Sequence, residues 1–266
     1  MSLLRLPLLL IVFVLATGGA IAQQSAPAQQ PIAQPSQRDA KALAVLQAST
    51  AAMGKSLPAD STAQGTVTTT AGSLSESGTV TVLTKGTTQT SEQIQTPHGF
   101  ALVYSDGQAS HVADSATATL SSELALSSRS FAFPLVALAD VLNNPDSGYA
   151  YVGLESVDGA ALHHLQFWNS FNSRPKFQPL ASLTLTDLWI DSATGLPQRI
   201  SQIRRAGRGS EPRIQVDVSF SDYRNVSGVL YPFQIQESIN GSPWKTLTIT
   251  SVTFNTGLTD TNFPIQ

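Results

Sequence analysis

The sequence contains no cysteine and few charged residues. Without cysteine the chain cannot form a disulfide, bind a metal through thiolates or carry a lipid on an N-terminal cysteine. Charged residues make up 12% of the sequence, about half of the ~25% usual for soluble domains, and the formal net charge is −3. Such a chain is poorly suited to neutralising a phosphate backbone or anionic lipid head groups. We therefore expect no nucleic-acid partner.

Motifs that carry catalytic chemistry are also missing. No serine lies in a Gly-x-Ser-x-Gly elbow, and no glycine-rich phosphate loop is present. The four histidines are His98, His111, His163 and His164. Adjacent side chains on a strand point to opposite faces, so His163 and His164 cannot easily hold one ion. We predict no metal, no cofactor and no enzymatic activity.

Two further features have alternative interpretations. The carboxylates Asp187 and Asp191 in TDLWID are expected to face solvent, although paired carboxylates also catalyse glycoside hydrolysis. The arginines near a glycine-containing turn predict an exposed hairpin tip, with a docking site for an acidic partner as the alternative. These arginines are Arg199, Arg204, Arg205, Arg208 and Arg213. A hydrolase assembled from scattered residues would show a nucleophile hydrogen-bonded to His98, His111 or His163.

The N-terminus has the three parts of an export signal. Arg5 is followed by an apolar run over residues 6–16 and by the small-x-small pattern at residues 20–22. A transmembrane helix normally needs ~20 apolar residues, so the run is too short to remain as an anchor. No later stretch is apolar enough to span a membrane. We predict cleavage after residue 22 and a periplasmic or secreted protein.

The rest of the chain divides into a tether and one domain. Residues 23–37 are rich in Pro, Gln and Ala, which indicates a disordered tether. A helix is predicted from Asp39, a suitable N-cap, to Met53, with Gly54 at its end and with Ala40, Leu43, Leu46 and Met53 on one face. Residues 38–266 are expected to form a single domain with enough chain for one core.

Beyond this helix the apolar period changes from helical to alternating. Strands are predicted over 79–82, 87–96, 150–155, 161–168, 182–190, 213–220, 230–237 and 245–254. Turn pairs separate them at residues 106–107, 158–159, 194–195, 227–228 and 240–241. Residues 135–142 interrupt the pattern with a short apolar helix that is bounded by prolines. The sequence therefore predicts a mostly β (α+β) fold.

Several segments together resemble the periplasmic lipoprotein-carrier and outer-membrane lipoprotein-sorting (LolA-like) superfamily. The order of elements carries the resemblance from about Asp39 to Phe254. The segments are the helix ending in Met53-Gly54, ALVYSDGQASHVAD, LVALADVLN, YVGLESVDGAALHHLQF, LTDLWIDSATGLPQRI and FSDYRNVSGVLYPFQIQ. The resemblance implies a long curved antiparallel sheet, forming an unclosed half-barrel with two or more helices packed on its concave face.

The resemblance also implies a function without catalysis. A half-barrel of this kind would shield an apolar ligand, either an acyl chain, a lipid or a lipidated protein. An envelope sensor or protein-interaction module with the same fold and no lipid cargo is the alternative, with an envelope protein as its partner. Aromatic side chains and the mid-chain helix are the predicted groove and lid, although such residues more often form a simple core, and in an unclosed barrel the core face is also the binding face. They are Phe131, Phe133, Leu135, Leu138, Val141, Leu142, Trp168, Trp189, Tyr231 and Phe233.

Overall fold

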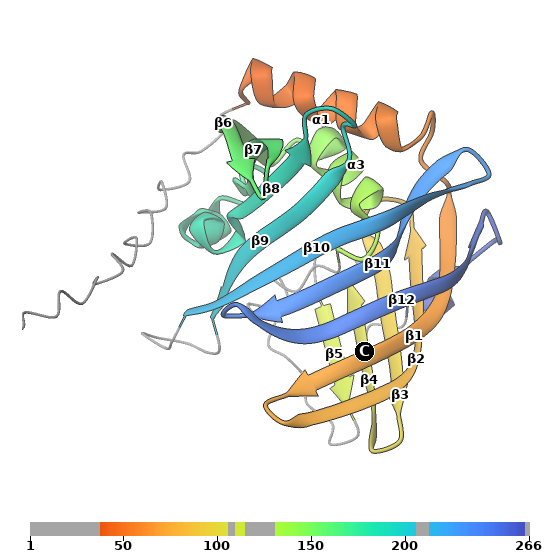
Figure 1. The fold of residues 1–266 in the computed structure, drawn as a ribbon. Coiled ribbons are helices and arrows are strands. Elements are labelled where there is room, and N and C mark those ends of the chain that lie inside the picture. Colours follow the sequence, from red (N-terminus) through yellow and green to blue (C-terminus); the bar gives the residue numbers. More distant parts are fainter. Residues whose placement is uncertain (1–37, 106–109, 115–130, 206–212, 264–266) are drawn as a thin grey trace, which may run out of the picture. The chain divides into compact units, whose positions relative to one another are not determined.

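The computed structural model describes residues 38–105, 110–114, 131–205 and 213–263 (Figure 1). The expected export signal and tether, residues 1–37, lie outside these ranges and stay predictions. The turn at 106–107 and the arginine-containing tip at 206–212 also lie outside them. No helix in the described ranges is both long and apolar enough to cross a membrane.

In the described ranges, twelve strands form one antiparallel sheet in the order β5-β4-β3-β2-β1-β12-β11-β10-β9-β8-β7-β6. Because β5 and β6 are its two edges, the sheet does not close into a barrel. The strands are β1 (Asp60–Ala71), β2 (Leu74–Lys85), β3 (Gln89–Thr96), β4 (Gly99–Ser105), β5 (Ser110–Asp114), β6 (Ser147–Val157), β7 (Ala160–Asn169), β8 (Thr186–Asp191), β9 (Pro197–Arg205), β10 (Arg213–Val226), β11 (Val229–Ile239) and β12 (Ser242–Phe254).

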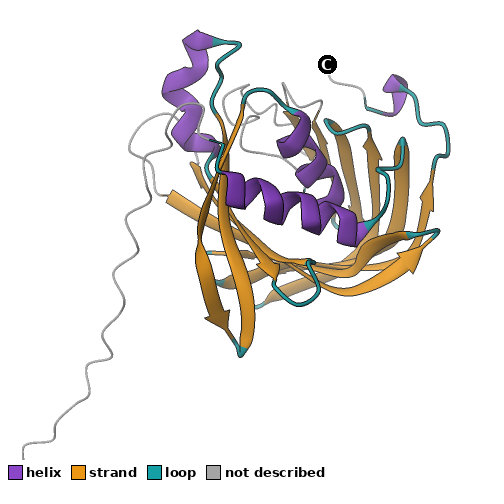
Figure 2. Ribbon diagram, turned by 90° about the horizontal axis from the view of Figure 1, so that it is seen from above, coloured by secondary structure: helices purple, strands orange, loops and turns teal. Residues whose placement is uncertain are grey.

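The predicted half-barrel is confirmed, because the sheet curls around helices α1 (Ala40–Met53) and α3 (Pro134–Asn143) (Figure 2). Two 3₁₀ segments, η1 (Pro175–Thr184) and η2 (Asp260–Asn262), lie outside this curl. The sheet and its two enclosed helices therefore share one core on the concave face.

Helix α1 begins and ends where the sequence predicts. The Asp39 carboxylate accepts the backbone N–H groups of Lys41 and Ala42, and Gly54 is the C-cap. The buried face differs from the expected one, because Ala42 and Ser49 join Leu46 and Met53 there. Ala40 is exposed and Leu43 is half-buried. Because the helix is rich in alanine and leucine, the sequence pattern did not define which of its faces is buried.

Tight turns join neighbouring strands at the predicted pairs within the described ranges. Asp158-Gly159, Ser227-Gly228 and Asn240-Gly241 all have positive φ at both residues, as two-residue hairpin turns of type I′ require. The sequence pattern did not predict β1, because its sequence DSTAQGTVTTTA is rich in threonine and shows little alternation of apolar and polar residues. It also began β8 too early, because residues 182–184 belong to η1.

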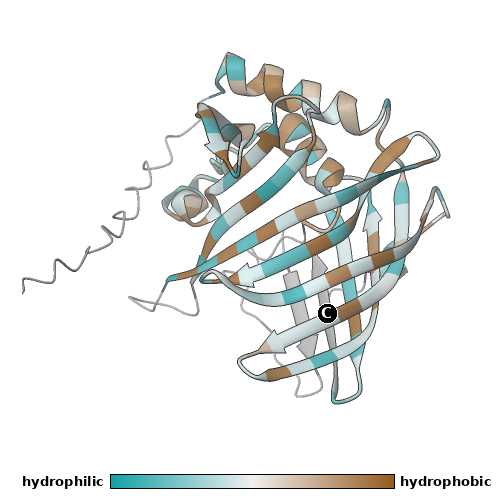
Figure 3. Ribbon diagram, viewed as in Figure 1, coloured by the Kyte–Doolittle hydropathy of each residue, from teal (hydrophilic) through white to brown (hydrophobic). Residues whose placement is uncertain are grey.

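The core lies between the helices and the inward-facing residues of the strands. Hydrophobic residues alternate along β8 to β12, which is visible as brown bands across those strands (Figure 3). Leu188, Ile200, Val218 and Leu247 are among the inward side chains and are at most 6% exposed. This apolar band lies on the side of the sheet that holds both helices.

Candidate functional site

Helix α3 brings most of the predicted groove residues into one cluster. Its side chains are almost fully buried, and Asp140 is the only charged residue in it. The Phe133 ring lies 4.6 Å from the Tyr231 ring, and the Tyr231 ring lies 6.4 Å from that of Phe233. The cluster contains Phe131, Phe133, Leu135, Leu138, Val141, Tyr231 and Phe233, with Leu142 half-buried beside it.

The two predicted tryptophans lie elsewhere. Trp168 follows the core residue Phe167 on β7, so its side chain points to the opposite face of the sheet. Its indole packs on Gly148 of the neighbouring strand, where a Cβ atom would lie only 2.3 Å from the indole. Trp189 alternates with the core residues Leu188 and Ile190. Both indoles are therefore on the convex face and do not line the concave face. Alternation along each strand was the signal that would have separated them from the groove residues.

The concave face also holds charged side chains that were not anticipated. We call Glu92, Arg204, Glu237 and Lys245 the inner ion cluster. The Lys245 Nζ lies 2.5 Å from Glu92 Oε1 and 3.0 Å from Glu237 Oε2, and Arg204 approaches Glu237 at 4.0 Å. Glu237 and Lys245 are paired directly next to the inward pair Ile235 and Leu247. The cluster therefore points into the half-barrel.

Each charge in this cluster is influenced by burial and by its neighbours. Burial alone would lower the pKa of the Lys245 ammonium, but Glu92 and Glu237 raise it above its usual range. Burial would raise the pKa of Glu237, yet the two nearby cations lower it. For Arg204, burial prevails and lowers the pKa, although Glu237 and Glu92 oppose it. The cluster is a set of opposite charges removed from water.

Tyr231 connects the aromatic cluster with these charges. Its side chain is fully buried, and its hydroxyl has no hydrogen-bond partner among the described residues. Burial and the charge of Glu92 raise the pKa of Tyr231 beyond its usual range. The concave face thus changes from aliphatic and aromatic at α3 to charged at the inner ion cluster.

A second charged array crosses the convex face. We call Glu155, His164, Asp187, Trp189, Arg199 and Asp217 the outer ladder. Its first half centres on His164, whose Nδ1 and Nε2 lie 2.6 Å from Glu155 and 2.7 Å from Asp187. Burial opposes protonation of His164, but the two carboxylates outweigh it and raise the pKa of this histidine. The two carboxylates thus favour the protonated form of His164.

The other half of the outer ladder stacks on Trp189. The His164 ring lies 4.4 Å from the indole at an angle of 13°, and the Arg199 guanidinium lies 4.5 Å from it. Asp217 accepts from Arg199 Nη2 at 2.7 Å. The expectation that the Arg199 to Arg213 segment is simply an exposed tip is therefore wrong for Arg199 and Arg204, which lie on β9 and face opposite sides of the sheet.

The remaining predicted polar residues have local partners. Tyr151 and His163 share a hydrogen bond of 3.0 Å on the face opposite to His164, as adjacent strand residues should. Asp187 is 14% exposed rather than solvent-facing. Asp191 accepts from the N–H groups of Ala193 and Thr194, which lower its pKa. No group of three or more His, Asp or Glu side chains in the described ranges is arranged so that it could hold a metal ion.

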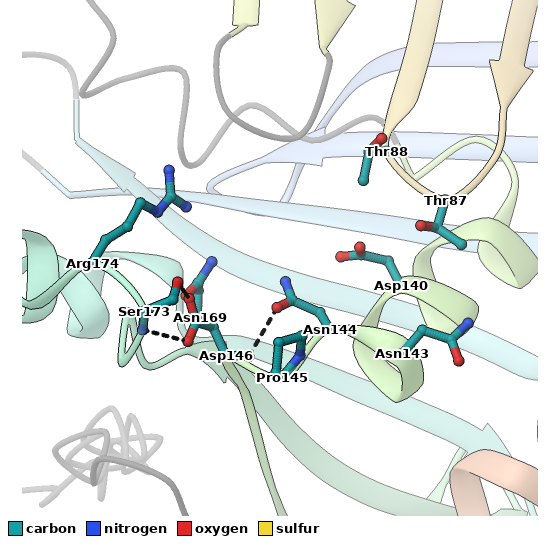
Figure 4. Close-up of a pocket in the computed structure, with 10 residues that line it drawn as sticks. All are labelled: Thr87, Thr88, Asp140, Asn143, Asn144, Pro145, Asp146, Asn169, Ser173 and Arg174. Carbon is teal, nitrogen blue, oxygen red and sulfur yellow. Dashed lines mark hydrogen bonds between the residues drawn. The ribbon is translucent and has the colours of Figure 1, made fainter.

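A polar pocket of about 470 Å³ lies at the C-terminal end of α3 (Figure 4). Three separated segments meet there: the turn between β2 and β3, the end of α3 with the loop that follows, and the segment after β7. We call this the rim pocket. Its lining residues are Thr87, Thr88, Asp140, Asn143, Asn144, Pro145, Asp146, Asn169, Ser173 and Arg174.

Comparison with solved structures identifies the fold. A domain of an outer membrane lipoprotein-sorting protein from Vibrio parahaemolyticus is 14% identical, with a TM-score of 0.56, over 84% of this chain and 96% of that one. A LolA superfamily protein from Nitrosomonas europaea is 16% identical, with a TM-score of 0.56, over 84% and 97%. A DUF1329 family protein from Desulfovibrio piger is 14% identical, with a TM-score of 0.55, over 86% and 98%.

These similarities confirm the LolA-like fold that the order of elements indicated. No family model matches the chain, and no curated protein matches it in sequence. At 14–16% identity the likeness concerns the fold, and the residues of the concave face have to be interpreted from their own chemistry.

Proposed function

We propose that this chain is an exported, periplasmic binding or carrier protein that shields an apolar ligand within the half-barrel. The ligand would be an acyl chain, a lipid or a lipidated protein. The observation that carries the proposal is the apolar character of α3 on the concave face, where the sheet and helix together present aliphatic and aromatic side chains.

Hydrophobic burial would supply the affinity. Each CH₂ group removed from water contributes about 0.8 kcal/mol, so a long acyl chain binds well without any charged contact. Helix α3 is short and is the natural lid, because it starts at Pro134 without a side-chain cap and ends within ten residues. Movement of this helix would open the apolar cluster, and the same movement would release the ligand.

Photo-crosslinking tests the proposal at the level of single positions. A benzophenone amino acid is introduced at Phe133, on the concave face, and at Trp189, on the convex face, and the protein is purified from a bacterial periplasm. We expect a lipid or lipopeptide to be crosslinked from position 133 and not from 189, as mass spectrometry of the adduct would reveal. Equal labelling at both positions, or no labelling and no uptake of a fluorescent fatty acid, would refute the proposal.

A protein-interaction module remains the second candidate, because β6 is an edge strand with exposed apolar side chains. Val152 is 49% exposed and Leu154 is 59% exposed. An exposed edge is a template for strand addition by another polypeptide. Replacement of Val152 by proline removes one backbone N–H group from this edge strand. Loss of binding to an envelope protein in this variant, without loss of lipid, would favour this second function.

A further inference from the structure

The rim pocket has a hydrogen-bonding character unlike that of the apolar cluster. Its lining contains amides, hydroxyls, carboxylates and one guanidinium, and no aliphatic side chain larger than that of Pro145 (Figure 4). Its volume of about 470 Å³ falls within the ~300–1,000 Å³ typical of small-molecule sites. A ligand of this pocket must therefore be polar.

Local hydrogen bonds orient the asparagines of the pocket. Asn144 Oδ1 accepts the N–H of Asp146 at 2.9 Å, and Asn169 Oδ1 accepts the N–H of Phe171 at 2.9 Å. Since the oxygens are engaged, the two NH₂ groups remain available as donors. In the described part of the chain, the side chains of Thr87, Thr88 and Asn143 make no hydrogen bond. The pocket thus offers hydroxyl and amide groups that can both donate and accept.

The pocket contains charges of both signs, two carboxylates and one guanidinium. Asp146 is occupied, because its carboxylate accepts the N–H of Ser173 at 2.8 Å and also the Ser173 hydroxyl. The Arg174 guanidinium lies 5.5 Å from the Phe171 ring and has no ion pair with a described residue. It faces the same pocket as the carboxylate of Asp140. An anion would meet two carboxylates there, and a cation would meet the guanidinium.

We propose that the rim pocket binds an uncharged polyhydroxylated group, such as a sugar ring. Each hydroxyl of such a group donates one hydrogen bond and accepts others, which matches the amide and hydroxyl lining. Arg174, held by its aromatic neighbours, donates to ring or hydroxyl oxygens. The proposal is independent of the apolar ligand, because the sugar would be either free or the head group of a lipid.

Two kinds of probe distinguish those sources. Free sugars (maltose, galactose and N-acetylglucosamine) and glycerol are tested by saturation-transfer NMR. Dodecyl maltoside is tested below its critical micelle concentration against dodecylphosphocholine, which has the same tail and a charged head. We expect at least one sugar, or dodecyl maltoside, to bind, and Arg174→Met to weaken that binding about tenfold, the usual effect of losing a charge-assisted hydrogen bond.

Variants assign the binding to this pocket. Asn143→Ala alters an exposed side chain in the pocket, and Thr66→Ala, on an exposed outer position of β1, is the matched control. Weakening by Asn143→Ala and Arg174→Met, but not by Thr66→Ala, supports the proposal. If dodecyl maltoside binds and the free sugars do not, the ligand is a lipid-linked sugar, provided that the variants leave the affinity for dodecylphosphocholine unchanged.

The opposite results overturn the proposal. The first is that none of the four free probes binds and that the two dodecyl compounds bind with equal affinity. The second is that a sugar binds and that Arg174→Met and Asn143→Ala leave its affinity unchanged. Failure of dodecylphosphocholine to bind would count against the apolar groove and leave the rim pocket supported if the free sugars bind.

Discussion

The inner ion cluster and the outer ladder both pair carboxylates with cationic side chains, on opposite faces of one sheet, but they connect strands differently. In the outer ladder, the ion pairs join adjacent strands between β6 and β10, and only the Trp189 indole reaches past a strand, donating to Glu155 on β6. In the inner ion cluster, Glu92 on β3 reaches Lys245 on β12 across the intervening β2 and β1. Curvature is the reason: side chains on a concave face converge, whereas those on a convex face diverge.

This difference predicts how the contacts of each array would respond if the curvature of the sheet changed. The Glu92–Lys245 contact would break if the half-barrel opened, because it spans strands that are not neighbours. The ion pairs of the outer ladder would survive, because each of them joins strands that are hydrogen-bonded to each other. The inner ion cluster therefore ties the β3 side of the half-barrel to the β12 side, and the outer ladder reinforces one side only.

The largest expected effect comes from removing the central cation of the inner ion cluster. In Lys245→Met, two carboxylates remain close together and away from water, so we expect a loss of about 3–5 kcal/mol in the free energy of unfolding. Urea denaturation measures this loss. The matched change on the outer face, Arg199→Met, should cost about 1 kcal/mol or less, because Arg199 is 40% exposed. Equal losses would contradict the comparison.

Rescue sharpens this prediction. Adding Glu92→Gln, Glu237→Gln and Arg204→Met to Lys245→Met replaces all four charges of the inner ion cluster. We expect most of the lost stability to return, since replacing a whole buried ion cluster by neutral groups is often nearly neutral. A quadruple variant as unstable as the single one would show that packing of the lysine stem, and not charge, was responsible.

The next effect concerns the pH dependence of the outer ladder. Because Asp187 and Glu155 raise the folded-state pKa of His164, the stabilisation is complete below the usual histidine pKa of about 6.5 and is lost as the pH rises through the folded-state pKa. His164→Gln should therefore cost about 1 kcal/mol at pH 6 and less at about pH 9. Thermal unfolding of both proteins at the two pH values measures the difference. A constant difference would mean that His164 is neutral.

High salt should weaken the ion pairs of the outer ladder more than those of the inner ion cluster. At 1 M ionic strength the Debye length is about 3 Å, so exposed charges are screened and buried ones much less. We expect the coupling energy of Arg199 with Asp217, about 0.5 kcal/mol in a double-mutant cycle, to vanish in 1 M NaCl. The coupling of Glu92 with Lys245 should persist, because these side chains are 8% and 14% exposed. Loss of both couplings would show that water reaches the inner ion cluster.

Much of the fold was predictable from local patterns, and much of the site was not. Asp39, the Asn-Gly and Asp-Gly turns and the apolar spacing of α3 act within a few residues, so each was readable in the sequence. Glu92 and Lys245 are 153 positions apart, and only curvature brings them together. Glu237 is two residues from Ile235, and Lys245 is two residues from Leu247, so the alternation of side chains along a strand did indicate that these charges face inward. The rim pocket had no local signal, because three distant segments form it.

The smallest expected effect concerns a buried hydroxyl of the aromatic cluster that has no partner among the described residues. The Tyr231 hydroxyl is buried without a hydrogen bond to any described residue, so Tyr231→Phe should leave stability unchanged or raise it by up to about 1 kcal/mol. Tyr223 is the matched control, because its hydroxyl donates to the Pro197 carbonyl at 2.7 Å, and Tyr223→Phe should cost about 1 kcal/mol. Chemical denaturation of both variants measures the two changes. If Tyr231→Phe were as costly as Tyr223→Phe, the hydroxyl would have a partner outside the described residues, and the concave face would be closed there by protein rather than available to a ligand.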